Sequence, residues 1–256
     1  MSKTLNSIAN IHEAYVVARK RLLLLDYDGT LVPFVSRPEL AKPSTRLLTI
    51  LQKLVTDSCN TVMIISGRDK DALDRWLGHL PLQFIAEHGA FEKRGGSWLT
   101  TTNPSSAWKE QVRPLLGSRL EGLLGTQLEE KETSLVFHYR SAVDTEKGRK
   151  VANDLQQELE PIAAKLGLTM THDNLTIEIR PSDTNKGQAV LASLTERNYD
   201  FVLCAGDSQT DEDMFIELKD RAFCVKVGSG QTAAKYRIKN PGDFVDFLAS
   251  LLEVEA

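Results

Sequence analysis

The stretch RLLLLDYDGTLVPF, residues 21–34, decides the fold of this chain. Its four leucines, residues 22–25, run without polar alternation, a pattern typical of a central strand that is buried on both faces of a parallel sheet. Two acids, Asp26 and Asp28, follow at once. Because the carboxyl ends of parallel strands face the crevice where open α/β sheets bind ligands, both acids are candidates for a binding site.

The pair of acids has two interpretations. Asp26 and Asp28 point to the same side if the chain stays extended, and Gly29 permits the bend that follows. Two close carboxylates repel each other unless a cation compensates, and a hard cation such as Mg²⁺, which prefers oxygen ligands, would do so. A plain turn is the alternative, since Asp-Gly is a common turn dipeptide.

The composition is that of an ordinary globular protein. The chain has 256 residues, of which 41% are hydrophobic and 26% charged, enough for one large α/β domain or two domains. The chain has 31 basic and 35 acidic residues and therefore a net charge of -4. This charge balance does not indicate binding to nucleic acid or to an anionic membrane surface. No apolar run reaches the length of a membrane span, and no signal peptide is evident, so we expect a cytoplasmic protein.

The three cysteines have no metal-binding pattern. Cys59, Cys204 and Cys224 are widely spaced and form no CxxC pair. The last two lie in apolar runs, which predicts buried, inert thiols.

Strands and helices alternate over most of the chain. The residue patterns predict helices at 8–19, 43–55 (with Pro43 in its first turn), 69–77, from Lys186 onward, at 210–218 (capped by Thr210) and after Pro241, strands at 61–65, 82–86, 201–205 and 222–227, and a hairpin around 93–98. This alternation predicts a doubly wound, mostly parallel, Rossmann-like sheet formed by residues 1–103 and 181–256.

A different pattern occupies residues 104–180. A helix at 105–116 is followed by the segment EEKETSLVFHYR as a strand pair or one long strand. A long helix at 144–166, ended by Pro161 and Gly167, precedes two strands that join at Asp173-Asn174. The order α-β-β-α-β-β, with hairpin connections, predicts an inserted α+β cap domain.

Polar residues follow four of the predicted core strands, and they should meet at one edge of the sheet. They are Asp26 with Asp28, Ser66 with Gly67, Glu87 with His88, and Asp207 with Asp211, and Lys186 can reach the same edge. Acids and a backbone carbonyl can hold Mg²⁺, while a serine, an amide and a lysine can neutralise phosphate oxygens.

Each of these residues also has a purely structural interpretation. Ser66 could cap a helix, Lys186 could be a surface lysine, and His88 could be a core histidine. Asp211, Glu212 and Asp213 could complement the dipole of their own helix, and Glu129 with Lys131 could form a solvated charged patch.

Four motifs in order, DYDGTL, the strand ending at Ser66, Lys186 and GDSQTDEDMF, resemble those of the haloacid dehalogenase-like phosphatases, and the resemblance covers the whole chain. Finer signatures (IISGR, AEHGA, the Glu-x-Lys and HYR pattern, EIRP, NKG and TDEDMF) are similar to one branch, the trehalose-6-phosphate phosphatases. The resemblance implies a Mg²⁺-dependent phosphoric monoester hydrolase that converts trehalose 6-phosphate to trehalose and phosphate through an aspartyl-phosphate.

The resemblance also assigns roles in the core. Asp26 would be the nucleophile and Asp28 the general acid and base, while Thr30 would orient their loop. Ser66, Gly67 and Lys186 would bind the phosphoryl group. The metal ligands would be Asp26, the backbone carbonyl of Asp28, Asp207 and Asp211, the last of these directly or through a water.

In the cap, the resemblance places Glu129, Lys131, Arg140 and Glu178 on the sugar, and it offers Arg68, Glu87 and His88 as further substrate contacts. Cap closure would exclude water from the reaction. Two departures stand out: Asp173-Asn174 replaces a common Gly-Lys, and Gly206-Asp207-Ser208 replaces a common Gly-Asp-Asp. The first puts one sugar contact in doubt, and the second leaves the acids Asp207 and Asp211 in place.

Other functions remain open at this point. Within the superfamily, the alternatives are phosphatases of sucrose 6-phosphate or mannosyl-phosphoglycerate. A regulatory domain that binds a sugar phosphate without hydrolysing it belongs to a different class, and a phosphotransferase or phosphomutase would need a phosphate-bearing acceptor instead of water. Similar domains also occur fused to trehalose-6-phosphate synthase, which is therefore a candidate partner.

Overall fold

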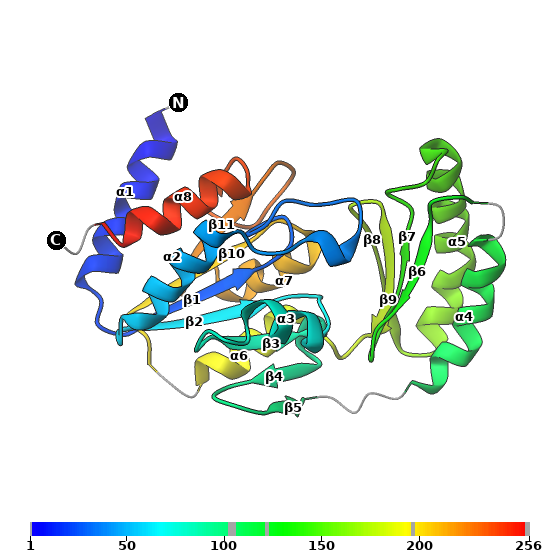
Figure 1. Ribbon diagram of the computed structural model, residues 1–256, viewed down its shortest axis with the longest axis horizontal. Coiled ribbons are helices and arrows are strands. Elements are labelled where there is room, and N and C mark those ends of the chain that lie inside the picture. The colour runs from blue at the N-terminus through cyan, green and yellow to red at the C-terminus, as the bar shows by residue number, and fades with distance from the viewer. Residues whose placement is uncertain (1, 102–105, 121–122, 196–197, 254–256) are drawn as a thin grey trace. The chain divides into compact units, whose positions relative to one another are not determined.

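The computed structural model describes residues 2–101, 106–120, 123–195 and 198–253 (Figure 1). The chain divides into two compact units, Met1–Thr101 with Asn185–Ala256, and Thr102–Thr184. Residues 103–105, which contain the predicted domain boundary and the predicted start of the first cap helix, lie outside the described residues. Within the described ranges, none of the helices is both long and apolar enough to cross a bilayer.

The first unit, called the core here, is built on an eight-stranded sheet in the order β12-β11-β10-β1-β2-β3-β4-β5. Six strands are parallel: β1 (Arg21–Asp26), β2 (Asn60–Ile65), β3 (Gln83–Ala86), β10 (Phe201–Gly206), β11 (Phe223–Val227) and β12 (Tyr236–Ile238). An antiparallel hairpin, β4 (Phe91–Lys93) and β5 (Trp98–Thr100), completes one edge. The predicted mostly parallel α/β fold is therefore confirmed, and only the short β12 was missing from the prediction.

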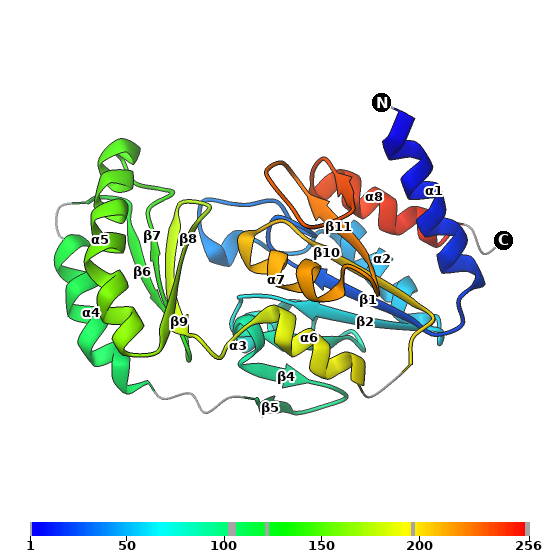
Figure 2. The same ribbon diagram turned by 180° about the vertical axis from the view of Figure 1, so that it is seen from behind.

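Helices cover both faces of this sheet (Figures 1 and 2). One face carries α1 (Ser2–Val17), α2 (Thr45–Thr56), α3 (Lys70–Leu77) and α8 (Pro241–Leu251), and the other carries α6 (Lys186–Thr195) and α7 (Gln209–Leu218). The leucines of β1 divide between the two: Leu23 and Leu25 join the first core cluster, Leu22 and Leu24 the second. All four are fully buried, as the unbroken apolar run predicts.

The first helix, α1, begins at Ser2 and not at residue 8 as predicted, and two other helices differ from the prediction in the residues at their starts. Ser44 caps α2 by accepting a hydrogen bond from Leu47 N at 3.1 Å, so Pro43 precedes the helix and does not lie in its first turn. Ser208, not Thr210, is the N-cap of α7. Both differences have the same cause, because a serine side chain just before the first helical residue satisfies the helix terminus better than a residue inside the first turn.

The second unit, called the cap here, has a four-stranded antiparallel sheet in the order β6-β7-β9-β8. Its elements are α4 (Ala107–Leu120), β6 (Gln127–Glu130), β7 (Leu135–His138), α5 (Thr145–Lys165), β8 (Leu168–Asp173) and β9 (Thr176–Pro181). One face of the sheet packs on both helices: Phe137 and Ile177 lie in the same buried cluster as Val112 of α4 and Leu155 of α5.

Two details of the cap refine the sequence prediction. Helix α5 runs to Lys165, close to the predicted end at residue 166, so Pro161 lies inside the helix and does not mark its end; the buried stripe of Leu155, Leu159 and Ala163 runs past Pro161, and packing outweighs the missing backbone donor. The β8–β9 turn is formed by Asn174 and Leu175, which both have positive φ, one position later than predicted.

Short 3₁₀ helices and buried thiols complete the core. The 3₁₀ helices are η1 (Pro38–Leu40) and η2 (Glu87–Gly89). Cys204 and Cys224 are buried as predicted, and burial raises the pKa of the Cys204 thiol well above its usual value, which leaves that thiol inert.

Candidate active site

The carboxyl ends of neighbouring core strands carry the predicted polar residues. Asp26 ends β1, Ser66 follows β2, η2 follows β3 and Asp207 follows β10. Lys186, the first residue of α6, links two of these loops: its Nζ lies 2.8 Å from Asp26 Oδ1 and 2.8 Å from Asp211 Oδ1. The fold therefore brings Asp26 together with a lysine that lies 160 positions later in the sequence.

Lys186 is a buried lysine and not a surface one, with 2% of its surface exposed. Burial alone would lower its pKa, but the carboxylates of Asp211 and Asp26 outweigh burial and raise the pKa above its ordinary value. The ammonium is therefore permanently charged and holds both carboxylates in fixed positions.

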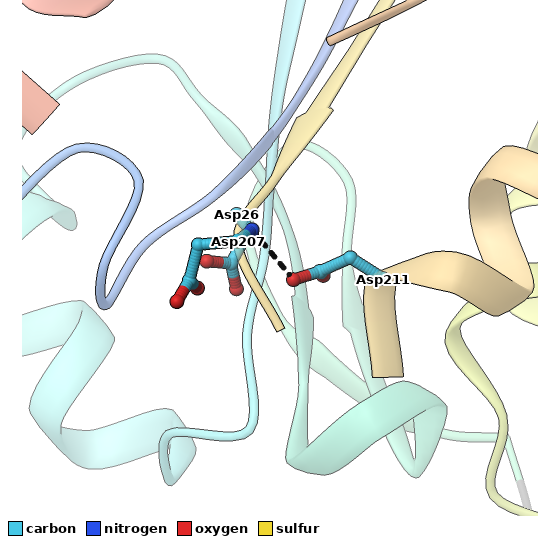
Figure 3. Close-up of side chains that lie close together, drawn as sticks. All are labelled: Asp26, Asp207 and Asp211. Carbon is cyan, nitrogen blue, oxygen red and sulfur yellow. Dashed lines mark hydrogen bonds between the residues drawn. The ribbon is translucent and has the colours of Figure 1, made fainter. Parts of the chain in front are cut away.

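Asp211 is fully buried, and it does more than complement the dipole of α7. Its Oδ2 accepts hydrogen bonds from Ser208 N (2.8 Å), Ser208 Oγ (2.7 Å) and Asp207 N (3.0 Å), the last of which is drawn in Figure 3. Burial acts against its charged form, yet Lys186 and the Ser208 donors prevail and lower its pKa. Asp211 therefore stays ionised and fixes the loop that carries Asp207.

Asp26, Asp207 and Asp211 form an acidic cluster in which one carboxylate oxygen of each lies within 4.8 Å of the others (Figure 3). Asp26 Oδ2 and Asp207 Oδ1 are buried and have no hydrogen-bond partner among the described residues. Burial and the neighbouring acids raise the pKa of Asp26 to about 7 and that of Asp207 to about 9. Lys186 therefore does not fully compensate the negative charge, and a divalent cation with oxygen ligands fits the cluster.

Gly29 allows the loop after β1 to approach Asp207. Its φ is +83°, and a Cβ at this position would lie 2.3 Å from Asp207 Oδ2. Only glycine fits there, because any side chain would clash with that carboxylate and would also strain the backbone. The Asp-Gly dipeptide is thus a turn, as the structural interpretation predicts, and it also brings two acidic loops together.

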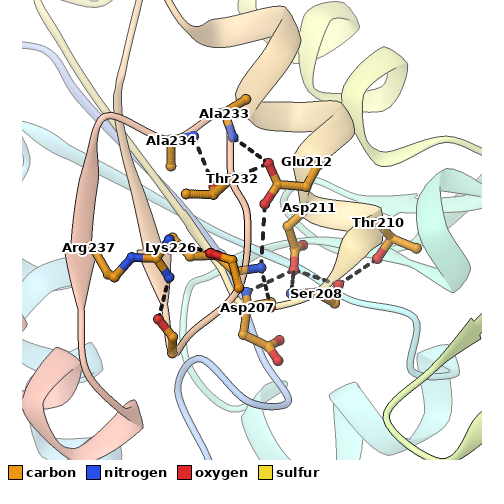
Figure 4. A network of polar contacts seen from close by, with 12 residues as sticks. Asp207, Ser208, Thr210, Asp211, Glu212, Lys226, Thr232, Ala233, Ala234 and Arg237 are labelled. Atoms are coloured by element: carbon orange, nitrogen blue, oxygen red, sulfur yellow. Dashed lines mark hydrogen bonds and ion pairs between the residues drawn. The ribbon is translucent and has the colours of Figure 1, made fainter.

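A second buried lysine supports the Asp207 loop, and the sequence analysis missed it. Lys226 Nζ donates to the backbone carbonyl of Asp207 and lies 3.4 Å from Glu212 Oε1 (Figure 4). Glu212 also accepts from Ala233 N at 2.7 Å and from Thr232 Oγ1 at 3.2 Å. Glu212 therefore ties two loops together, and the available signal was a single lysine within the apolar strand AFCVKV.

The loop after β2 is held by its own side chains. Ser66 is buried, and its Oγ accepts from Arg68 N at 3.1 Å, while Asp69 and not Ser66 caps α3. The side chain of Arg68 makes a bidentate pair with Asp28, with Nε–Oδ2 and Nη2–Oδ1 distances of 2.7 Å each. The structure thus places Arg68 on an acid of the predicted catalytic pair.

The predicted residues of η2 and the β1 loop are buried. Glu87 and His88 have positive φ and are 2% and 6% exposed. The His88 ring lies so close to Gly67 that a Cβ there would be 2.4 Å from Nε2. Thr30 is also fully buried, and its hydroxyl has no hydrogen-bond partner among the described residues.

The second face of the cap sheet is polar. Cross-strand pairing places Glu129, Val136 and Glu178 in one row on this face, opposite to the face that packs on the helices. Glu178 Oε1 lies 2.9 Å from Ser134 Oγ and 3.3 Å from Lys131 Nζ. The side chains of Lys131 and Glu178 are only 10% and 12% exposed, so they do not belong to a solvated surface patch.

Neighbouring side chains extend this polar face. His138 Nε2 lies 2.7 Å from Glu129 Oε2, and Arg140 Nη2 donates to the backbone carbonyl of Asn174 at 2.6 Å. Tyr139, the next residue in the chain, points the other way and is buried in the cap core. His138 and Ser134 were not among the predicted site residues, although their alternation along β7 indicated the same face.

Residues 24–241 match a protein-family profile described as trehalose-phosphatase. The chain belongs to the trehalose-phosphatase family. This confirms the family inferred from the motifs, and it agrees with the predicted class of phosphoric monoester hydrolases.

Similar proteins agree with this family. Over 96% of its length, the chain is 38% identical to a bifunctional trehalose-6-phosphate synthase/phosphatase of Thermoproteus tenax, of which it covers 33%. It is 39% identical to a trehalose-phosphatase of Zygosaccharomyces rouxii, with 86% of this chain and 27% of that protein covered. The chain therefore spans about a quarter to a third of the length of these relatives.

A solved structure shares the whole architecture. The C-terminal domain of C. albicans trehalose-6-phosphate phosphatase matches with a TM-score of 0.90 and 32% identity, and 96% of each chain is covered. The likeness extends over both units of the trehalose-phosphatase fold described above.

Proposed function

We propose that this member of the trehalose-phosphatase family is a Mg²⁺-dependent phosphatase that hydrolyses trehalose 6-phosphate to trehalose and phosphate. The observation that carries the proposal is the acidic cluster of Asp26, Asp207 and Asp211 around the buried Lys186, at the end of β1. This arrangement offers a nucleophilic carboxylate, a fixed positive charge and oxygen ligands for a cation at one point.

The reaction would proceed in two displacements. In the first, a carboxylate oxygen of Asp26 attacks phosphorus, the bond from phosphorus to the sugar oxygen breaks, and Asp28 gives that oxygen a proton. In the second, a water oxygen attacks phosphorus, the bond to Asp26 breaks, and Asp28 takes the proton of the water. The intermediate between the two steps is an aspartyl-phosphate on Asp26.

Three groups would hold the phosphoryl oxygens. Ser66 supplies a buried hydroxyl, Gly67 a backbone amide, and Lys186 a charge that is already fixed 2.8 Å from the nucleophile. These donors need not reorganise while charge develops on the phosphoryl group. Thr30, buried in the same loop as both acids, would maintain the shape of that loop.

The residues fit a magnesium ion. Asp26 and Asp207 each present a buried oxygen without a hydrogen-bond partner among the described residues, and the backbone carbonyl of Asp28 would complete the protein ligands. Both oxygens of Asp211 already accept hydrogen bonds, so Asp211 would support the metal site through Lys186 and the Asp207 amide. The cation supplies charge neutralisation for the phosphate.

Cap residues would recognise the sugar. The polar face of the cap sheet carries Glu129, Lys131, Arg140 and Glu178, which together offer hydrogen-bond acceptors and donors suited to sugar hydroxyls. Ser134 and His138 hold two of the acids in place on that face. Glu87 and His88 are proposed substrate contacts in the core; both are buried, and the His88 ring lies against Gly67, whose amide would bind phosphate.

A synthase is the proposed partner. The bifunctional relative from Thermoproteus tenax combines synthase and phosphatase names in one protein, and this chain covers a third of it. A synthase activity on the same or a separate chain would supply the substrate directly.

Phosphate release from trehalose 6-phosphate, sucrose 6-phosphate and glucose 6-phosphate, with and without Mg²⁺, tests the proposal. We expect Mg²⁺-dependent release with a strong preference for trehalose 6-phosphate. Release from another of these sugar phosphates would keep the chemistry and reject the substrate. Binding of trehalose 6-phosphate with no release from any of the three would support the non-hydrolytic regulatory domain instead.

A further inference from the structure

We infer that Arg68 is a positioning residue that aims the carboxylate of Asp28, and this inference rests on the function proposed above. Both oxygens of Asp28 accept from the guanidinium, Oδ2 from Nε and Oδ1 from Nη2, each at 2.7 Å. A bidentate fork of this kind fixes a carboxylate in plane and in rotation, which a single contact does not.

The guanidinium is itself fixed. Its third nitrogen, Nη1, donates to the backbone carbonyl of Pro38 at 2.6 Å, and its Cζ lies 5.0 Å from the ring centroid of Trp76. The side chain is 12% exposed, against 26% for Asp28. Arg68 is therefore a rigid element against which the more exposed acid is held.

The backbone of Arg68 is held at both ends. Its N–H donates to Ser66 Oγ at 3.1 Å, and its carbonyl accepts from Glu87 N at 3.0 Å. Ser66 is also a proposed phosphate ligand, so the phosphate site and the orientation of Asp28 depend on the same loop. This coupling explains why the loop after β2 carries a serine and an arginine two residues apart.

This role differs from substrate binding, the role that the sequence resemblance offered for Arg68. All three guanidinium nitrogens donate to groups of this chain, to Asp28 and to the Pro38 carbonyl. The guanidinium then acts on the reaction through Asp28. In the first displacement Asp28 protonates the sugar oxygen as the bond to phosphorus breaks, and in the second it takes a proton from the attacking water.

Leaving groups that differ in their need for a proton test the role. A sugar oxygen must be protonated as it leaves, whereas the phenolate released from p-nitrophenyl phosphate need not be. Water attack on the aspartyl-phosphate is common to both substrates, so the first displacement is followed alone, as the burst of leaving-group release in a single turnover. We expect Arg68→Met to slow this burst by roughly 10²-fold for trehalose 6-phosphate and by less than about threefold for p-nitrophenyl phosphate, because only the sugar oxygen requires the acid. Arg68→Lys keeps the charge without the fork, and its kcat for the sugar phosphate should lie between those of Arg68→Met and the wild type.

A double-mutant cycle separates positioning from substrate binding. If Arg68 acts only through Asp28, adding Arg68→Met to Asp28→Asn should lower kcat no further. A merely structural Arg68 would slow the burst of leaving-group release for both substrates alike, and a substrate contact would raise KM for the sugar phosphate in both backgrounds. Either result overturns the inference.

An exposed arginine and the aryl phosphate substrate provide the controls. Arg75→Met changes an exposed arginine of α3 and should leave both activities unchanged. A retained burst of p-nitrophenolate release by Arg68→Met shows that the variant is folded. A wild-type chain without any phosphatase activity would overturn the proposed function and this role together, whereas normal wild-type turnover with equal losses of the burst rate on both substrates overturns the role of Arg68 alone.

Discussion

Replacing Asp211 by asparagine removes one buried charge and keeps the shape of the side chain. The Asp211 carboxylate accepts from Lys186 Nζ on one oxygen and from three donors, supplied by Ser208 and Asp207, on the other. An amide has a single oxygen, so its NH₂ group must face either the ammonium or these three donors. In either orientation the NH₂ group faces another hydrogen-bond donor, and we therefore expect a large loss of stability.

The structure sets the size of this loss. The attraction between Lys186 and Asp211 at 2.8 Å amounts to about 6 kcal/mol at an effective dielectric constant of about 20. The variant also relieves repulsion from Asp26, whose nearest oxygen lies within 4.8 Å, and this repulsion is about 3.5 kcal/mol under the same assumption. At about pH 8, Asp26, with its pKa of about 7, is mostly ionised, whereas Asp207, with its pKa raised to about 9, is mostly neutral and adds little repulsion.

The difference of about 2.5 kcal/mol, together with about 1 kcal/mol for an unsatisfied donor, predicts a loss of about 3–4 kcal/mol in the free energy of unfolding. This value agrees with the roughly 3–5 kcal/mol that removal of one partner of a buried ion pair costs. For a domain of this size, Tm should fall by about 6–16 °C.

Urea unfolding of the Mg²⁺-free protein at about pH 8 measures the effect, and an unchanged m-value would show that the unfolded state is not altered. Glu217→Gln, on the exposed side of the same helix, is the matched control and should change stability by less than about 0.5 kcal/mol. In a Lys186→Met background only the repulsion from Asp26 remains, so Asp211→Asn should become stabilising there. A loss below about 1 kcal/mol, or equal losses in both backgrounds, would refute the reasoning.

Three further predictions concern the reaction and its metal. Asp26→Asn should abolish phosphate release and keep Mg²⁺-dependent binding of the sugar phosphate by calorimetry; substantial residual turnover would reject Asp26 as the nucleophile. The pKa of Asp26 is raised from 3.8 to about 7 and that of Asp207 to about 9, so the folded metal-free chain binds protons that the unfolded chain releases, and its stability should fall as pH rises through these values. Mg²⁺ should therefore raise Tm more at about pH 8.5 than at about pH 6, and a pH-independent increment would contradict the assigned ligands. Glu178→Ala should lower turnover of trehalose 6-phosphate far more than that of an aryl phosphate, and equal losses on both substrates would remove this residue from sugar recognition.

The sequence carried enough information to predict the core strands and the residues at their ends. An unbroken apolar run such as residues 22–25 is stable only as a strand in a sheet that is covered on both faces. Polar residues directly after such a strand then lie at the carboxyl ends of the strands, where ligands bind. The short strand β12 has only three residues and too little alternation to be recognised.

The contacts between loops could not be predicted in the same way. Arg68 and Asp28 are 40 positions apart, and nothing in either local pattern indicates the bidentate pair. The burial of Lys186 follows from the meeting of α6 with two acids that come from other loops. The pairing of His138 with Glu129 depends on the register of β6 and β7, which a turn of unknown geometry sets.

Pro161 shows how tertiary packing can override a local rule. Proline usually ends a helix, yet α5 passes through this position because its buried stripe continues on both sides. The missing backbone N–H of a proline can be read from the sequence, but the contacts of α5 with the cap sheet cannot.

The pairing of β1 with β10 constrains the order in which the chain folds. Arg21 of β1 pairs with Phe201 of β10, and closing a loop of this length (201 − 21 = 180 positions) costs about 2.5 kcal/mol more free energy, through lost chain entropy, than closing one of about ten residues. The cap strands instead pair as the neighbouring hairpins β6–β7 and β8–β9, whose contacts are local and fast to form. We therefore expect the cap to fold early and β10 to join the core sheet late. The carboxylates of the acidic cluster then come together only at the end of folding, so a partly folded chain cannot hold the metal.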